Sequence, residues 1–259
     1  AASVAPTPVS ALLHAVAVVK GGVFALMRVV YWCFGAGFLI GTKVQAAVLC
    51  TCCITILYGS LRALCTQHLK RRLAYSTVSQ LSYILMGVML MTPAGLSAGL
   101  THMVCHALMK ITLFFCAGAI LYKGGREYVY ELRGVGRAMP VTMTCFTLAG
   151  LGLVGVPLFA GFVSKFMLGS AAAEAGGLGM LGVACLIISA FFTLFYMVLI
   201  IGAAWFPAEG REDSHWNTHC DPNWNMKLPL IAITAMSMVL GLWSGPLIQV
   251  FNRIAAGGM

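Results

Sequence analysis

The sequence predicts an all-α integral membrane protein with about seven transmembrane helices, the fifth of them broken in mid-membrane. Of its 259 residues, 60% are hydrophobic and 9% are charged, whereas a soluble domain carries about 25% charged residues. Seven segments are apolar over the roughly 20 residues that a helix needs to cross a bilayer. The connections between these segments carry nearly all the charge. These observations exclude a soluble globule, so lipid surrounds most of the chain.

The seven apolar segments follow one another along the chain, and the length and composition of each predict a transmembrane element. They are Val9–Trp32, Val44–Leu64, Leu73–Met91, Gly95–Tyr122, Val141–Glu174, Leu178–Phe206 and Leu228–Phe251. The chain opens with Ala1 rather than Met, so we expect its natural start to lie upstream.

The fifth segment is too long for one straight helix, and it contains Gly155, Pro157 and Gly161 close together. Proline removes a backbone hydrogen bond and glycine relaxes the geometry, so we predict a helix break at these residues. About 14 residues on each side would span about 21 Å apiece. Together they exceed a hydrocarbon core of about 30 Å, which places the break inside the membrane. Broken helices of this kind mark ion sites in transporters.

The distribution of Lys and Arg predicts the orientation, because cytoplasmic loops carry the excess of positive charge. If the segments alternate, ten lie on the side of the N-terminus: Arg62, Lys70, Arg71, Arg72, Lys123, Arg126, Arg133, Arg137, Arg211 and Lys227. Three lie on the other side: Arg28, Lys43 and Arg253. We therefore expect the N-terminus in the cytoplasm and the C-terminus outside. The net charge of +9 does not indicate a nucleic-acid partner, since basic residues on lipid-facing helices do not reach phosphates.

Three lysines, Lys20, Lys110 and Lys165, lie inside predicted transmembrane segments. A Lys at the bilayer centre costs at least about 2.5–3.5 kcal/mol, so these residues are predicted to be functional. The alternative is snorkelling, in which a Lys near a helix end lifts its ammonium group to the interface. The positions of the three near the middle of a segment or near the break disfavour that alternative. Burial disfavours the charged ammonium form, so a buried Lys can exchange protons near neutral pH, which Arg cannot do.

His102, His106 and Lys110 recur every four residues in the fourth segment, and such residues share one face of a helix. Neutral imidazoles accept a proton at one nitrogen and donate from the other, so with ordered water they can form a relay to Lys110. A zinc site is one alternative, but the Glu of the His-Glu-x-x-His motif is absent and no third ligand is near. The other alternative is that both histidines are uncharged and only pack in the core. His14 is a further candidate, although its spacing from Lys20 puts the two on different faces of a helix.

Other features of the sequence indicate no chemistry of their own. A group in the sixth connection resembles a metal cluster by residue type, but its spacing matches no metal signature, and a solvated loop is favoured. This group is Asp213, His215, His219, Cys220 and Asp221. The sequence lacks a Walker loop, a dinucleotide fingerprint in strand–helix context and the Cys spacing of an iron–sulfur centre. We therefore expect no metal, no cofactor and no catalytic centre in this chain.

Four stretches of the chain carry a family resemblance: Ala5–Ala15, Lys70–Gln80, Thr101–Lys110 and Pro157–Lys165. In this order they resemble the antiporter-like subunits of respiratory complex I, of Mrp-type sodium/proton antiporters and of membrane-bound hydrogenases. The first resembles the start of the family's eighth helix, and the second resembles the stretch from its ninth to its tenth helix. The third and fourth are similar to its eleventh helix and its broken twelfth helix.

The resemblance implies a role for each lysine within the membrane. Lys20 would connect two half-channels. Lys110 would be the central proton-carrying lysine of the second half-channel, with His102 and His106 beside it. Lys165 would face the exit side, where family members carry Lys or Glu.

The resemblance also implies the second inverted repeat of a 14-helix fold. Residues 1–32 would be the last helix of the first repeat, residues 44–206 the five-helix second repeat, and residues 228–251 a closing helix. The N-terminal half of the fold, helices one to seven, would be absent. His68 stands where the family usually has an Asp, so we expect a loop contact to differ there.

The leading functional prediction is a proton-translocating membrane subunit, here a fragment, of a redox-driven pump like NADH:quinone oxidoreductase. It would lie in a prokaryotic plasma membrane or the mitochondrial inner membrane. One alternative is a component of an Mrp-type antiporter or of a membrane-bound hydrogenase, and a second is a structural remnant that conducts nothing. The expected partners are other membrane subunits, including the absent N-terminal half or a neighbouring antiporter-like subunit, the lipid bilayer, and protons or sodium.

Overall fold

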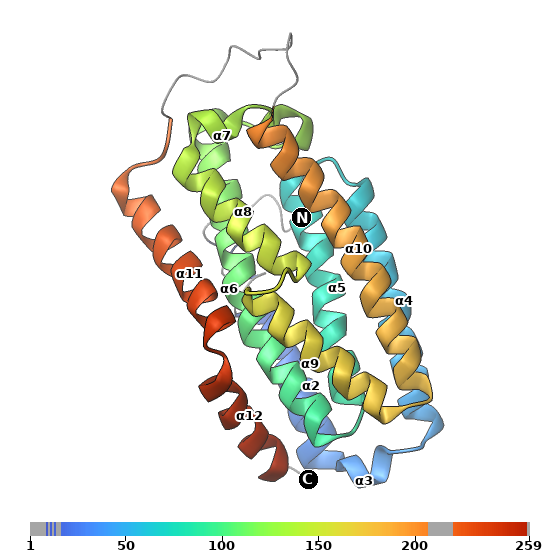
Figure 1. Ribbon diagram of the computed structural model, residues 1–259. Coiled ribbons are helices and arrows are strands. Elements are labelled where there is room, and N and C mark those ends of the chain that lie inside the picture. Colours follow the sequence, from blue (N-terminus) through green and yellow to red (C-terminus); the bar gives the residue numbers. More distant parts are fainter. Residues whose placement is uncertain (1–8, 10, 12, 14–16, 207–219, 258–259) are drawn as a thin grey trace.

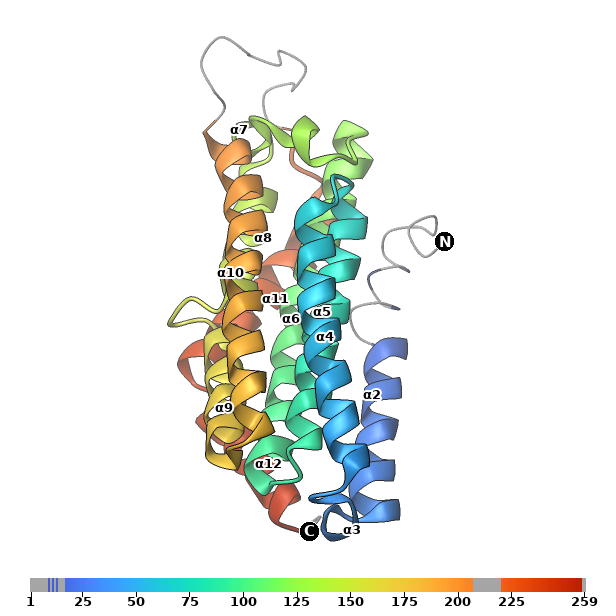
Figure 2. The same cartoon turned by 90° about the vertical axis from the view of Figure 1, so that its right-hand side faces the viewer.

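The computed structural model describes residues 17–206 and 220–257, together with residues 9, 11 and 13. In this described part the chain forms a bundle of long helices and contains no strand (Figure 1). The longer helices run up and down the bundle, and short helices lie at its two ends (Figures 1 and 2).

The helical elements follow the chain without long intervening segments in the described part. They are α2 (Val18–Arg28), the π-helix η2 (Val29–Phe34), α3 (Ala36–Leu39), α4 (Lys43–Cys65), α5 (Leu69–Met89), α6 (Pro93–Gly124), the 3-10 helix η3 (Val129–Leu132), α7 (Val135–Ala138), α8 (Pro140–Val154), α9 (Ala160–Ala175), α10 (Leu178–Trp205), α11 (Trp224–Leu242) and α12 (Gly245–Gly257).

Proline and glycine set several of the helix ends. Pro93 and Pro140 begin α6 and α8, where a missing N–H costs nothing because the first N–H groups of a helix have no partner within it. Thr92 caps α6 by accepting a hydrogen bond from the backbone N–H of Gly95 at 3.1 Å. Gly125, at φ +63°, ends α6 in the left-handed conformation that glycine adopts without strain.

The last predicted segment is wrong in one respect, because it is two helices rather than one. Helix α11 ends at Leu242, and α12 begins at Gly245. Pro246 lies in the first turn of α12, where its missing N–H costs no hydrogen bond within that helix, but it could not donate to a carbonyl of α11 if the helix continued. The first predicted segment also differs, since its last turns form the π-helix η2 in the described residues.

Four helices are long and apolar enough to cross a membrane by length and composition: α4, α6, α10 and α11. Helix α8 is a shorter apolar helix. Helix α5 contains Lys70, Arg71 and Arg72 in its first turn and several polar residues after them, which lowers its mean hydropathy. The sequence therefore predicts more spanning elements than these criteria identify in the described residues.

Helix α6 is the centre of the bundle. It contacts α5, α8, α9, α11 and α12, while α10 packs against α4, α8 and α9. Helices α8 and α9 follow one another along the chain but are offset sideways, and their junction lies at mid-length of the bundle beside α6 (Figure 1). Helix α2 lies on the outside and packs against α5 (Figure 2).

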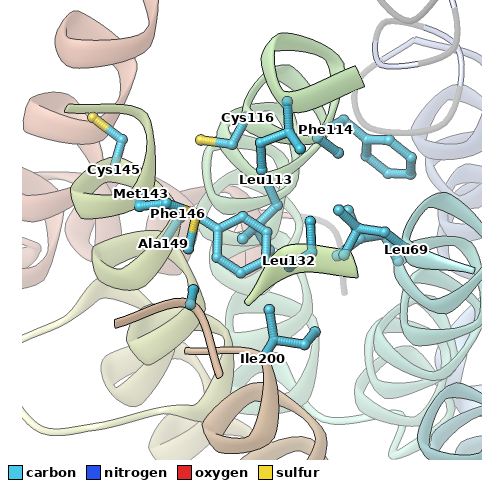
Figure 3. Close-up of a cluster of buried hydrophobic side chains, with 14 of the residues drawn as sticks. Leu69, Leu113, Phe114, Cys116, Leu132, Met143, Cys145, Phe146, Ala149 and Ile200 are labelled. Carbon is cyan, nitrogen blue, oxygen red and sulfur yellow. The ribbon is translucent and has the colours of Figure 1, made fainter. Parts of the chain in front are cut away.

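Two hydrophobic clusters fill the two ends of the bundle. The first joins α5, α6, α8 and α10 to the short helices and includes Leu69, Leu113, Leu132 and Phe146 (Figure 3). The second joins α2, α4, α5, α6, α9 and α10 and includes Leu96. On α6 the polar residues at positions 101–110 therefore lie between the part of the helix in one cluster and the part in the other.

Candidate functional site

The break between α8 and α9 is the irregular backbone closest to the predicted site. Helix α8 ends at Val154 and α9 begins at Ala160. Gly155 has φ +95° and Leu158 has φ +79°. For Leu158 this left-handed conformation is strained, since its Cβ crowds the backbone. The structure therefore places the interruption at residues 155–159, within the range that the sequence predicts.

Gly161 has a different role from the one predicted, because it lies inside the first turn of α9 rather than in the break. A Cβ at this position would overlap the carbonyl oxygen of Gly152 and would lie 3.1 Å from Met109 Sδ. Gly161 is thus required for the close approach of α8 and α9. A similar contact lies on the other side of the break, where a Cβ at Gly241 of α11 would overlap the carbonyl oxygen of Leu158.

The polar stripe of α6 is completely buried. Thr101, His102, His106 and Lys110 have no exposed surface. The rings of His102 and His106 stack, with centroids 5.9 Å apart and planes 13° apart. The spacing of four residues therefore brings the two histidines together on one face, with Lys110 one turn further along.

Lys110 donates to neutral oxygen atoms of α5. Its Nζ atom donates to the Leu73 carbonyl oxygen at 2.9 Å and to the Ser76 hydroxyl. The hydroxyls of Ser76 and Thr77 also donate to the Leu73 carbonyl, each at 2.9 Å. The ammonium group is thus held by a carbonyl that several donors share.

Lys165 lies in the second turn of α9 and reaches back to the break. Its Nζ atom donates to the carbonyl oxygens of Leu153 at 2.6 Å and Val154 at 2.9 Å. These are among the last carbonyls of α8, which have no donor within their own helix and carry the negative end of the helix dipole. The Lys165 ammonium also lies 5.8 Å from the centre of the Tyr83 ring, within the range of a cation–π interaction.

The two histidines differ in their hydrogen bonds. His102 Nδ1 lies 2.9 Å from Ser164 Oγ, and His102 Nε2 lies 3.1 Å from Gln80 Oε1. Neither ring nitrogen of His106 has a hydrogen-bond partner among the described residues. Buried polar groups normally find a partner in protein or in ordered water. His106 is therefore the member of the stripe that is best suited to bind water.

Lys20 lies on α2, at the edge of the bundle. It is 6% exposed although most of its neighbours on this helix face outward. Helix α2 packs against α5, and Lys20 is buried in the bundle. His14, the other candidate of the first segment, lies outside the described residues.

The sequence did not single out a cluster of hydroxyl groups between α4, α5 and α10. Tyr83 donates to Ser189 Oγ at 2.6 Å, and Ser189 contacts the hydroxyls of Ser60 and, at 3.2 Å, Ser79. Ser60 and Ser79 are 2.8 Å apart. A signal was present on α5, since Ser76, Ser79 and Tyr83 recur at helical spacing within an apolar segment.

The predicted acidic and histidine group of the sixth connection is only partly described, because Asp213, His215 and His219 lie outside the described residues. Asp221 has a structural role: its carboxylate accepts from the backbone N–H groups of Val141 at 3.1 Å and Thr142 at 3.3 Å. It thereby caps the start of α8. In the described ranges, no three His, Cys, Asp or Glu side chains come together as a metal site.

His68, at which the sequence predicts an altered loop contact, lies beside a glutamate. Its Nε2 atom lies 3.3 Å from Glu127 Oε2. The backbone pairs alongside, with Leu69 N–H donating to the Glu127 carbonyl at 2.8 Å and Val129 N–H to the Gln67 carbonyl at 2.9 Å. The loop before α5 is thus joined to the loop after α6.

Residues 1–200 match the family described as NADH:quinone oxidoreductase/Mrp antiporter, transmembrane. The NADH-quinone oxidoreductase subunit L of Mycobacterium tuberculosis is 34% identical over 242 residues, which cover 91% of this chain and 36% of that protein. A component of a probable K(+)/H(+) antiporter of Rhizobium meliloti is 35% identical over 93% of this chain and 24% of its own length. The chain therefore spans only about a quarter to a third of these two relatives.

A solved structure has the same fold. The membrane-bound sulfane sulfur reductase, an archaeal respiratory membrane complex, contains a chain with a TM-score of 0.86 and 27% identity, covering 98% of this chain and 50% of that one. The family match covers most of the residues, and the fold is that of an antiporter-like membrane protein. The chain belongs to the NADH:quinone oxidoreductase/Mrp antiporter transmembrane family, and it is an integral membrane protein.

Proposed function

We propose that this chain is the proton-translocating part of a membrane subunit in a redox-driven pump of the NADH:quinone oxidoreductase type. One observation carries the proposal: Lys110, Lys165 and two stacked histidines are all buried, and both ammonium groups donate to neutral oxygen atoms. Burial disfavours the charged form of an ammonium group that has no counter-charge, so such a group loses its proton readily. It therefore passes on its proton when another positive charge approaches.

The proposed path uses each residue for one task. Lys20 delivers a proton from the first half of the full-length subunit, and His106 with bound water carries it to Lys110 or His102. Lys165 releases the proton on the other side, where the break exposes helix carbonyls to the site. Residues 1–32 then correspond to the last helix of the first inverted repeat, residues 44–206 to the half-channel, and residues 228–251 to the closing element. The partners are other membrane subunits of the same complex.

The decisive experiment replaces Lys110 in the full-length subunit within its assembled complex. Lys110→Ala is expected to abolish or sharply reduce proton uptake by inverted vesicles driven by NADH, while assembly persists, since a methyl group is tolerated better than an ammonium in an apolar site. Lys110→Arg is expected to fail as well, because a guanidinium does not release its proton. Lys43→Ala is the matched control, since Lys43 is exposed at the start of α4. Wild-type uptake in an assembled Lys110→Ala variant would overturn the proposal.

A second candidate is a component of an antiporter, which the 35% identity to the probable K(+)/H(+) antiporter protein favours. The same vesicles distinguish the two. Uptake driven by an imposed sodium or potassium gradient, with no response to NADH, supports the antiporter. Uptake driven by NADH alone supports the pump.

The proposed orientation places the basic end of the bundle in the cytoplasm. Helix α4 ends beside Lys70, Arg71 and Arg72, and this end lies opposite η2 (Figure 2). Cys65 and Cys33 are exposed at these two ends. In single-cysteine variants, an impermeant maleimide is expected to label Cys65 in inverted vesicles and Cys33 in right-side-out vesicles. The reverse labelling would reverse the orientation.

A further inference from the structure

The Ser164 hydroxyl lies between two acceptors. It is 2.9 Å from His102 Nδ1 and 3.2 Å from the carbonyl oxygen of Gly161. The hydroxyl has a single hydrogen, so it can donate to only one of them at a time. Both Ser164 and His102 have no exposed surface.

The other side of the His102 ring faces an acceptor. Gln80 Oε1 lies 3.1 Å from Nε2, and an amide oxygen accepts but does not donate. Nε2 therefore keeps its hydrogen whether the ring is neutral or protonated. Any change in protonation takes place at Nδ1, the nitrogen that faces Ser164.

The two protonation states of His102 then have the same heavy-atom geometry. In the neutral ring, the Ser164 hydroxyl donates to Nδ1. In the protonated ring, Nδ1–H donates to Ser164 Oγ, and the hydroxyl hydrogen turns to the Gly161 carbonyl. Every polar atom of the ring is paired in both states, which matters because an unpaired charged donor in a buried site is strongly unfavourable.

We propose that Ser164 is a positioning residue that lets His102 take up and release a proton in place, by turning its hydroxyl between His102 Nδ1 and the Gly161 carbonyl. In the uptake step the hydroxyl hydrogen of Ser164 passes to His102 Nδ1, so an N–H bond forms as the O–H bond breaks. At the same time a Lys ammonium or a water of the buried group gives its proton to Ser164 Oγ, and the renewed hydroxyl turns to the Gly161 carbonyl. This inference rests on the proposed function, and it adds a residue at the start of α9 to the α6 stripe.

His106 provides the internal contrast. It has the same side chain and the same burial one turn away, yet neither of its nitrogens has a partner among the described residues. Its protonation depends on water, whereas that of His102 depends on Ser164. The two histidines are therefore expected to respond differently to the loss of one hydroxyl.

The test uses the full-length subunit in its assembled complex. Ser164→Ala is expected to lower the rate of proton uptake by about 10- to 100-fold at pH 8, the range expected for one hydrogen bond to a charged group. At pH 6 the loss is expected to be smaller, since a higher proton concentration favours the protonated His102 ring even without the hydrogen bond to Ser164. Ser164→Thr keeps the hydroxyl and is expected to restore the wild-type pH profile. Ser170→Ala, a change of the same kind on the same helix, is the control.

If Ser164→Ala fails to assemble, a second variant whose side chain is close to serine in volume provides the test. Ser164→Cys replaces the hydroxyl by a weak donor, and it is expected to show the same pH-dependent loss to a smaller extent. Wild-type rates and an unchanged pH profile in either assembled variant would overturn the inference.

A spectroscopic readout separates this inference from the proposed function. In complex labelled with ¹⁵N-histidine, the signals of His102 are identified by their loss in His102→Gln. We expect Ser164→Ala to change the Nδ1 signal of His102 from that of a bonded acceptor to that of an unbonded one, and to leave the His106 signals unchanged. An unchanged Nδ1 signal would overturn the inference even if the complex pumps no protons. Absence of pumping in the wild type, with the expected change in the signal, would overturn only the proposed function.

Discussion

Lys110 and Lys165 hold the same charge in two different kinds of backbone. Lys110 belongs to the continuous helix α6 and donates to a carbonyl and a hydroxyl of its neighbour α5. Lys165 belongs to a helix that follows a break, and it donates to two carbonyls at the end of α8. In the first case a side chain of another helix supplies half of the site. In the second case both hydrogen-bond acceptors are backbone carbonyls that the interruption leaves free.

The difference teaches what a broken helix contributes to a membrane protein. Carbonyls in the middle of a helix already accept from their own chain, and those at its end do not. A break at residues 155–159 therefore provides free acceptors within the bundle without any acidic residue. Lys165 requires the break, whereas Lys110 requires the packing of α5 on α6.

The largest effect is expected from adding a side chain at the point where α8 and α9 approach each other most closely. In Gly161→Ala the new Cβ would overlap the Gly152 carbonyl oxygen, and a backbone atom cannot move aside as a side chain can. We expect a loss of about 3 kcal/mol or more in the free energy of unfolding, seen as a lower Tm and a lower yield of the assembled complex. Gly169→Ala is the matched control on α9, since nothing lies within 4 Å of its Cβ position. Equal stability of the two variants would show that the approach of α8 and α9 is loose.

The next largest effect separates the two lysines directly. Lys165→Met leaves the carbonyls of Leu153 and Val154 without the donor that holds them, at about 1–3 kcal/mol for each group. Lys110→Met is expected to cost less, because the Leu73 carbonyl keeps the hydroxyls of Ser76 and Thr77 as donors. Thermal unfolding of the two purified complexes measures the difference. The same loss in both variants would show that the break holds its lysine no differently from a continuous helix.

A smaller effect is expected from the hydroxyl that Lys110 contacts. Ser76→Ala leaves Lys110 with the Leu73 carbonyl alone, and we expect proton uptake to fall about 10-fold, as for one hydrogen bond to a charged group. Thr77→Val removes a neighbouring hydroxyl that donates to the same carbonyl but does not contact Lys110. If both variants slowed uptake equally, the contact between Ser76 and Lys110 would not be the cause.

The smallest effect concerns the ring beside Lys165. Tyr83→Phe keeps the ring and removes the hydrogen bond to Ser189, so we expect about 1 kcal/mol less stability and nearly unchanged uptake. Tyr83→Leu also removes the ring and is expected to cost more than Tyr83→Phe, because the buried cation–π contact with Lys165 is lost as well. Unfolding and vesicle uptake of both variants check this order. A Phe variant as impaired as the Leu variant would assign the effect to the hydroxyl cluster.

The sequence predicts the long helices well because lipid imposes a composition on each of them. The segments Val44–Leu64 and Leu178–Phe206 differ from α4 and α10 by one residue at most at each end. The first interruption was predictable because Gly and Pro occur together in a segment too long for one helix. The second, at residues 243–244, was not predicted, because the segment that contains it has an ordinary length.

The site was predictable only where its residues share one helix. His102, His106 and Lys110 follow the helical repeat, so their common face is a property of the local sequence. Their partners Gln80 and Ser164 come from other helices, and which face of α5 or α9 meets α6 depends on packing. Polar residues at helical spacing on α5 are the signal that would have indicated its inward face.

The contact of Gly241 with the Leu158 carbonyl has a consequence for how relatives of this protein diverge. The last turn of α11 touches the break between α8 and α9, so neither stretch can gain a side chain at this contact without displacing the other. A lineage that alters the bend at residues 155–159 is expected to alter residues 241–244 in concert. These two distant stretches should therefore covary in an alignment of relatives, and a hybrid that takes them from different parents should assemble poorly.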